Sequence, residues 1–177
     1  MTLTLKNPKV ARLVAIASNM PRPKTHRETI RVEATPAEVF DLIHDYGRRL
    51  EWDPFLRRAE LLDANHAGVG VRARCVAKWT SGGAGMDVQY LSFDRPRVAA
   101  IEMVRGPWPL RTFVASLKQD PLDSGAATLV TYSFHFTSAL PWLTWPVFNR
   151  FFARETRGRL RALQRFFAKR QSETASL

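Results

Sequence analysis

The chain between residues 57 and 136 alternates apolar and polar side chains with a period of two. Residues 71–79 show this best, because Ala73, Cys75 and Ala77 are separated by polar or charged positions over most of the segment. Successive side chains of a β-strand point to opposite faces of a sheet, so the alternation is typical of strands with one buried face. The pattern predicts seven strands, at residues 26–33, 57–62, 71–79, 86–93, 98–105, 111–118 and 128–136. Short connections join the last six strands, which favours an antiparallel meander.

Two short helices are predicted between the first and second strands. Thr35 suits an N-cap, Pro36 suits the first helical position, and Glu38 lies close to a capping-box position. An apolar face follows, made by Val39, Phe40, Leu42 and Ile43. A second helix over residues 48–51 should end at Pro54, which lacks an amide donor and disfavours a helical conformation at the residue before it.

The corner at Pro54 has an aromatic residue on each side, Trp52 and Phe55. One interpretation is a hinge packed onto the core. The other is a rim that closes over an apolar molecule. The local sequence favours neither strongly enough to decide.

The apolar period returns to 3.6 residues near the C-terminus, where residues 146–169 predict one long helix. Its apolar stripe consists of Phe148, Phe152, Thr156, Leu160, Leu163 and Phe167. A stripe of arginines follows another face: Arg150, Arg154, Arg157, Arg161 and Arg165. No other predicted element is long enough to cover the apolar face of the sheet. We therefore predict an α+β fold, with a bent antiparallel sheet of about seven strands wrapped around this helix.

The length of 177 residues suits one domain with a single core. We expect that domain at residues 26–170, preceded by a basic extension at 1–25 and followed by a flexible tail at 171–177. A single cysteine, Cys75, excludes an intrachain disulfide and any multi-cysteine metal site. The apolar stretch at residues 13–17 is shorter than the ~7–15 residues of a signal-peptide core, so we expect a cytoplasmic protein.

The net charge of +11 lies at the two ends of the chain. Residues 1–27 contain six basic residues and no acidic one, and residues 148–170 contain eight basic residues and one acidic one. A nucleic-acid-binding domain usually carries its basic patch on the fold itself, so nucleic acid is not the expected partner.

The order of elements and two motifs resemble the helix-grip fold of the START-like superfamily, also called SRPBCC. Residues 35–40, Thr-Pro-Ala-Glu-Val-Phe, resemble the usual opening of its first helix. Residues 51–55, Glu-Trp-Asp-Pro-Phe, resemble its usual corner before the second strand. The polyketide cyclase/dehydrase and lipid-transport group is the branch most similar to this chain. The resemblance covers about residues 26–168 and implies a cavity between sheet and long helix that holds an apolar ligand. Members include sterol and phospholipid carriers, quinone binders and aromatase/cyclases, and the fold alone does not select among them.

Strand alternation together with this resemblance predicts which side chains line the cavity. The candidates are Trp52, Phe55, Ala73, Cys75, Ala77, Trp79, Met86, Val88, Tyr90, Ile101, Met103, Arg111, Phe113, Ala115, Tyr132, Phe134, Phe148 and Phe152. Small residues on one strand leave space, and Tyr90, Tyr132 and Arg111 are the polar groups on this face. A filled core without a cavity is the alternative, as is a solvated position for Arg111. Both buried tyrosines should bond a neighbour or a ligand.

The sequence contains no convincing catalytic constellation. His44 is the one histidine suited to acid–base chemistry, and a helix C-terminal position explains it equally well. We interpret Cys75 as a buried apolar side chain rather than a nucleophile. The glycine-rich residues 81–85 precede a strand and not a helix, so they predict a hairpin loop rather than a phosphate-binding loop. We expect no metal and no cofactor.

Residues 139–146, predicted as the loop before the long helix, contain Trp142 and Trp145. Tryptophan favours the bilayer interface, and the basic chain ends would be attracted to anionic lipid. We therefore expect a binder or carrier of a small apolar molecule such as a lipid, quinone, sterol-like or polyaromatic compound. The alternatives are a polyketide cyclase/dehydrase (aromatase)-like enzyme and an accessory protein at the membrane surface.

Overall fold

The computed structural model describes residues 25–174. The expected basic extension, apart from its last residue, and residues 175–177 of the expected tail lie outside the described residues. The expectation about residues 13–17 lies outside them as well.

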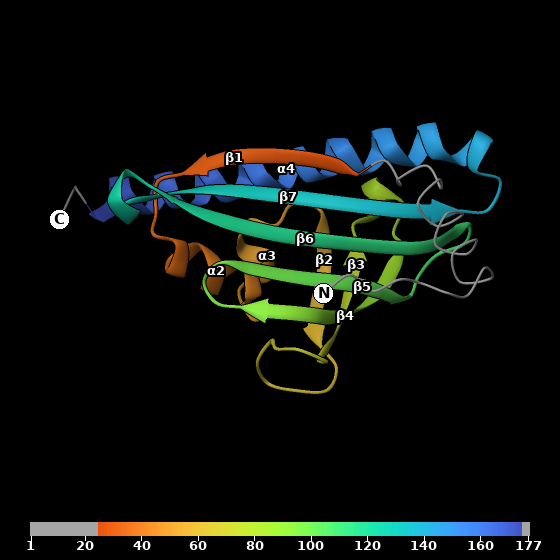
Figure 1. Ribbon diagram of the computed structural model, residues 1–177, viewed down its shortest axis with the longest axis horizontal. Helices are drawn as coiled ribbons and strands as arrows, with labels where there is room; N and C mark the ends of the chain where they lie inside the picture. The colour runs from red at the N-terminus through yellow and green to blue at the C-terminus, as the bar shows by residue number, and fades with distance from the viewer. Residues whose placement is uncertain (1–24, 175–177) are drawn as a thin grey trace, which may run out of the picture.

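The described chain forms one curled, seven-stranded antiparallel sheet that holds a long C-terminal helix (Figure 1). The strands are β1 (His26–Val32), β2 (Leu56–Leu61), β3 (Arg72–Ala77), β4 (Gly85–Asp94), β5 (Val98–Arg105), β6 (Leu110–Leu122) and β7 (Ala127–Ser138). They lie in the order β1-β7-β6-β5-β4-β3-β2. Two short helices, α2 (Pro36–His44) and α3 (Arg49–Trp52), follow β1, and α4 (Pro141–Thr174) ends the fold. The predicted helix-grip arrangement is confirmed.

The sheet is so strongly twisted that β2 and β3 cross the direction of β1 and β7 in Figure 1. Neighbouring strands of a sheet rotate relative to one another, and seven of them accumulate enough rotation to wrap around a helix. The concave face is therefore covered by α4 along one side and by α2 and α3 at one end.

The start of α2 has the predicted capping box. The backbone N–H of Glu38 donates to Thr35 Oγ1 at 3.3 Å, and the backbone N–H of Thr35 donates to the Glu38 carboxylate at 3.1 Å. These two bonds satisfy amide donors that a helix start otherwise leaves unpaired. They fix the direction in which α2 leaves β1, and with it the position of His44 at the other end of the helix.

The predicted apolar stripe of α4 faces the sheet. Leu160, Leu163 and Phe167 pack into a core with Val32 and Val130. Further toward the N-terminus of α4, Phe148 and Phe152 pack against a second cluster that includes Phe113, Phe134 and Phe136. The five arginines of the predicted stripe are all exposed, so this face of the helix is solvated.

The structure differs from the sequence prediction at both ends of α4. The helix begins at Pro141 and not at Pro146, so Trp142 and Trp145 lie on its first turns rather than in a loop. The amides of Leu143 and Thr144 already donate to the carbonyl of Leu140, which shows how the helix begins before its internal proline. At the other end the helix continues to Thr174, through residues predicted as tail.

Strand β6 is also longer than predicted, because it runs through Pro121 to Leu122. Its pairing with β7 continues to Leu122, whereas β5 pairs with it only as far as Lys118. Pro121 therefore lies where one edge of the strand is unpaired, and a missing amide donor costs nothing at such a position.

Candidate functional site

A cavity of about 430 Å³ lies between the concave face of the sheet and α4. Cavities that hold small molecules usually measure ~300–1,000 Å³ and have mainly apolar walls with a few polar groups. This one has mainly aromatic and aliphatic walls, with few polar side chains among them. The volume is large enough for a ligand, so the alternative of a completely filled core does not hold.

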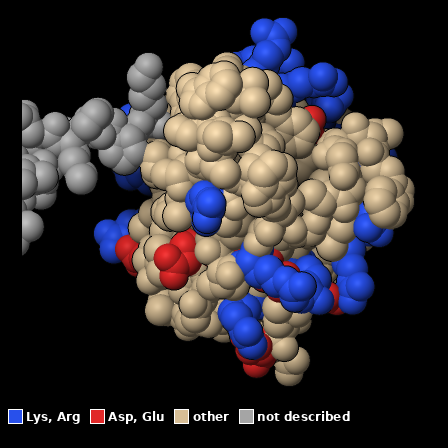
Figure 2. Space-filling view, turned by 90° about the vertical axis from the view of Figure 1, so that its right-hand side faces the viewer, with Lys and Arg blue, Asp and Glu red and all other residues tan. Residues whose placement is uncertain are grey.

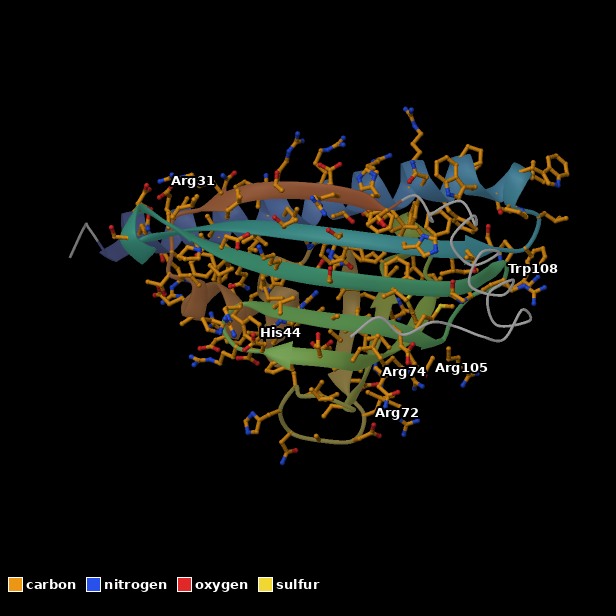
Figure 3. The ribbon with its side chains drawn as sticks, in the orientation of Figure 1. Arg31, His44, Arg72, Arg74, Arg105 and Trp108 are labelled. Atoms are coloured by element: carbon orange, nitrogen blue, oxygen red, sulfur yellow. The ribbon has the colours of Figure 1, made fainter. Side chains whose placement is uncertain are left out.

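The two ends of the cavity differ in character. Its mouth is formed by the β3–β4 connection with Gly82, by the β5–β6 connection with Trp108, and by Val147 on α4, all of which are exposed. Its floor lies deeper, among α2, α3 and the middle of α4. Figure 3 shows this separation, with Trp108 at one end of the molecule and His44 toward the other.

The structure places twelve of the predicted candidates on the cavity wall. They are Phe55, Cys75, Ala77, Met86, Val88, Tyr90, Ile101, Phe113, Ala115, Tyr132, Phe148 and Phe152. Phe148 and Phe152 come from α4, Phe55 from the corner before β2, and the others from five of the strands. Strand alternation brings these together because the concave face is one continuous surface.

Three aromatic or charged candidates lie elsewhere. Trp52 is buried in the core, where the guanidinium of Arg49 lies 4.7 Å from its ring. Trp79 is 75% exposed, because β3 ends at Ala77 and the chain turns into a 3-10 helix that breaks the alternation. Arg111 is exposed because a register shift between residues 110 and 112 of β6 turns its side chain out and leaves Leu110 facing in.

The other three candidates are within the protein but not on the wall. Ala73 is fully buried in β3. Phe134 is buried within the aromatic cluster that also contains Phe113 and Phe136, and Met103 packs against that same cluster. These positions are on the predicted face of the sheet but do not border the empty volume.

A hydrogen-bonded group of three polar side chains lies at the floor. His44 Nδ1 and the Tyr90 hydroxyl form a hydrogen bond of 2.9 Å, and the hydroxyls of Tyr90 and Tyr46 lie 3.3 Å apart. Burial lowers the pKa of His44 to about 3, with the positive charge of Arg49 acting in the same direction and Asp41 opposing it. Burial also raises the pKa of both tyrosines. All three groups are therefore neutral near pH 7.

A group of buried charges lies beside them. Asp53, at the end of α3, accepts hydrogen bonds at 3.0 Å from Nε of both Arg49 and Arg159. The backbone N–H of Phe55 donates to its other oxygen at 3.2 Å. Burial opposes the ionisation of Asp53, but the two guanidinium groups outweigh it and hold its pKa below the usual value. Pro54 and the buried carboxylate of Asp53 together fix the corner that the sequence predicted at Pro54.

Two further wall residues bear on chemistry. Burial raises the pKa of the Cys75 thiol, which argues against a reactive thiolate there. Tyr132 lies on the wall, and its hydroxyl has no hydrogen-bond partner among residues 25–174. We expected each tyrosine to bond a neighbour or a ligand. Tyr90 bonds His44, and the hydroxyl of Tyr132 is left for a ligand.

Sequence reasoning missed Tyr46, Arg49, Asp53, Glu155 and Arg159. The sequence held a signal for three of them. Arg49 and Asp53 are four residues apart, a spacing that brings side chains together on a helix. Arg159 falls three residues after Thr156 and four before Leu163, so helical periodicity puts it on the apolar face of α4 and not in the exposed arginine stripe.

Within the described part of the chain, no group of three or more histidine, cysteine, aspartate or glutamate side chains is placed to hold a metal ion. None of the helices described is long and apolar enough to cross a membrane.

The curled sheet, the gripped helix and the cavity between them define a helix-grip protein of the START-like superfamily. The family model named polyketide cyclase / dehydrase and lipid transport matches residues 24–167, and the chain belongs to this family. The Zhui aromatase/cyclase from a Streptomyces species is similar in structure, with a TM-score of 0.72 at 15% identity over 83% of this chain and 94% of that one. A START superfamily protein from Mycobacterium smegmatis is similar with a TM-score of 0.68 at 15% identity over 82% and 97%. No curated protein matches this chain in sequence.

Proposed function

We propose that this protein binds a small apolar molecule in its cavity and carries or sequesters it. The observation that carries the proposal is the empty volume of about 430 Å³ enclosed by aromatic and aliphatic side chains, with an open mouth. The family's description includes lipid transport, which agrees with such a role. Lipids, quinones, sterol-like molecules and polyaromatic compounds are the ligand classes that an apolar cavity of this size suits.

A neutral apolar fluorescent probe tests this proposal directly. Ala77 is 4% exposed and lies on the cavity wall, so Ala77→Trp would fill the space in front of β3. Ala100 lies between two wall residues of β5 and is not on the wall itself, so Ala100→Trp is the matched control. We expect the probe to bind the wild type and Ala100→Trp but not Ala77→Trp, with cooperative unfolding in all three. Unchanged probe affinity in a well-folded Ala77→Trp protein would contradict the cavity assignment.

The molecule that occupies the cavity in cells can be sought without prior assumptions. Mass spectrometry of organic extracts from the purified protein should reveal an apolar compound bound in a defined ratio. The same compound should be depleted from extracts of Ala77→Trp. Equal amounts of the compound in both extracts would show that it binds to the protein surface and not in the cavity.

A cyclase/dehydrase-like enzyme is the second candidate function, and the hydrogen-bonded group of His44, Tyr90 and Tyr46 favours it. Neither ring nitrogen of His44 is open to a bound molecule, because Nδ1 is bonded to Tyr90 and Nε2 is buried, with no partner among residues 25–174. Any proton transfer to a bound ketone would therefore pass through the tyrosine hydroxyls.

Incubation with a linear poly-β-ketone thioester, followed by mass analysis, would detect cyclisation with loss of water. Turnover that Tyr90→Phe abolishes without loss of probe binding would establish this activity, and no turnover by the wild type would remove it.

We also propose that the face around the cavity mouth contacts an anionic lipid surface. Trp108 and Trp142 are 79% and 78% exposed, and Val147 and Leu143 are exposed beside them. Figure 2 views this end of the molecule, where a broad and mostly uncharged surface is bordered by lysine and arginine side chains, with a smaller number of acidic ones among them. Apolar side chains in the centre and basic ones at the edge suit an interface whose surface is negative and whose interior is apolar. Contact at this face would put the mouth against the lipid that a carrier loads or releases.

Vesicle co-sedimentation distinguishes this contact from a solvated surface. We expect binding to anionic vesicles that weakens with salt, because the screening length falls from ~10 Å at 0.1 M to ~3 Å at 1 M. Trp108→Ser combined with Trp142→Ser should reduce the binding that survives high salt. Leu91→Ser, which removes an exposed apolar side chain of β4, is the control. Wild-type protein that ignores anionic vesicles at low salt would rule the contact out.

A further inference from the structure

Two buried guanidinium groups share a single carboxylate at the cavity floor. The side chains of Arg49 and Arg159 are 11% and 20% exposed, and that of Asp53 is 0% exposed. Arg159 Nη2 also lies 2.8 Å from the same oxygen of Asp53, so both arginines converge on one point. Arg49 makes a second hydrogen bond, from Nη1 to the carbonyl of Ile43.

Each arginine keeps nitrogen atoms that its protein partners do not use. A guanidinium has about five N–H donors. Nη2 of Arg49 and Nη1 of Arg159 have no hydrogen-bond partner among residues 25–174, and both side chains line the cavity. The Tyr132 hydroxyl on the same wall is likewise unpaired within that part of the chain. Unused donors on three elements thus belong to side chains that line the same cavity.

The charges of the group at the cavity floor do not cancel. Two positive guanidinium groups surround the one negative carboxylate of Asp53, which leaves a net charge of +1. His44 is uncharged near pH 7, as its pKa of about 3 requires. The remaining charged side chain on the wall is Glu155, one helical turn before Arg159 on α4 and therefore closer to the mouth. It forms no ion pair with either arginine.

An excess buried charge is costly unless a partner of opposite sign compensates it. Oxygen anions are the natural partners, because guanidinium donors match a carboxylate in two parallel hydrogen bonds. The apolar walls toward the mouth suit the rest of the same molecule. Recognition would then depend on a head group at the floor and an apolar body along the walls.

We propose that the ligand of this protein is an apolar molecule with an anionic oxygen head group, of which a carboxylate is the simplest, held between Arg49 and Arg159. The Tyr132 hydroxyl donates a hydrogen bond to the same head group. This inference rests on the proposed function, because it assigns a chemical class to the ligand of that cavity.

A series of ligands that differ only in the head group tests the inference on the wild-type protein. The neutral probe N-phenyl-1-naphthylamine is bound first and then displaced by dodecanoic acid, dodecan-1-ol or dodecylamine at pH 8. Hydrogen bonds to charged groups are strong. We therefore expect the affinity of the acid, measured by displacement of the probe, to be at least about tenfold higher than that of the alcohol. The amine should be the weakest of the three. If the probe binds but the acid is no tighter than the alcohol, this inference is overturned while the proposed function stands. If the probe does not bind at all, the proposed function itself fails.

Charge-neutralising variants locate the effect. Arg159→Gln retains an N–H donor for Asp53 but removes the excess charge, so it should lose most of the preference for the acid and keep its affinity for the alcohol. Arg161→Gln removes an exposed arginine two residues away and should retain the full preference. Glu155→Gln removes the negative charge on the wall toward the mouth and should bind the acid at least as tightly as the wild type. An acid preference that survives Arg159→Gln unchanged in a folded protein would overturn the assignment to this pair. If that variant does not fold, the wild-type head-group series decides by itself.

Discussion

Acid should destabilise this protein well above the pH at which its carboxylates become protonated, because His44 is buried as a neutral imidazole. Its ring packs between Phe40 and Phe93, at centroid distances of 4.3 and 5.0 Å, and its Nε2 has no partner in the part of the chain that the structure describes. Burial lowers its pKa from 6.5 to about 3. The perturbation we propose is His44→Gln, which keeps an amide that can bond the Tyr90 hydroxyl but cannot take up a proton.

The sign and size of the effect follow from proton linkage. Below pH 6.5 the unfolded chain protonates His44, whereas the folded protein does not until about pH 3. Stability is therefore complete above pH 6.5 and is lost progressively as the pH falls toward 3. Each pH unit in that window costs about 1.4 kcal/mol, so the loss is about 2 kcal/mol at pH 5 and about 4 kcal/mol at pH 3.

Urea denaturation at pH 7 and at pH 5 measures this effect. Between these two values, the unfolding free energy of the wild type should fall by about 2 kcal/mol more than that of His44→Gln. In a thermal melt the same difference amounts to about 4–8 °C for a domain of this size. His66→Gln, which removes an exposed histidine, is the matched control. Equal pH dependence in the wild type and His44→Gln would refute the reasoning, since it would mean that His44 ionises with similar ease in both states.

Three further changes test other parts of the structure. Asp53→Asn should lower the unfolding free energy by about 3–5 kcal/mol in urea denaturation, because it leaves two buried guanidinium groups without their anion; a loss below about 1 kcal/mol would show that solvent already compensates them. Thr35→Ala should cost about 1 kcal/mol in thermal unfolding by removing the cap of α2, and an unchanged melting temperature would contradict the capping role. Gly83→Ala should destabilise the β3–β4 connection and alter tryptophan fluorescence, because φ is +66° and the new Cβ would lie 2.3 Å from the Trp79 ring; a spectrum and stability equal to those of the wild type would show that the turn relaxes freely.

The elements that the sequence predicted well are those with a local cause. The strand at residues 98–105 has the predicted limits, and α2 begins with the predicted capping box. The apolar stripe of α4 faces the core along its whole length. In each case the side chains that define the element are neighbours in sequence, so periodicity and capping report directly on burial and hydrogen bonding.

The elements that it predicted poorly depend on neighbouring strands or on a turn. Arg111 points outward because of a register shift in β6, and Trp79 leaves the concave face because β3 ends two residues early. Pro121 continues a strand because β5 does not reach that far. Alternation alone cannot detect such changes, since each is decided by an adjacent strand or by the turn that ends the strand.

The cavity shows the same division. Its apolar walls follow from strand alternation, and twelve of the predicted candidates line it. Its charged floor does not follow from any local pattern, because Arg159 lies 106 residues from the Asp53 carboxylate that it binds. Buried apolar side chains recur in the sequence with the period of their strand or helix. Compensation of a buried charge depends instead on which distant side chain the fold brings within hydrogen-bond distance. The sequence by itself thus determined the apolar walls of the cavity. Only the packing of α4 against the Pro54 corner decided which charged groups meet at the cavity floor.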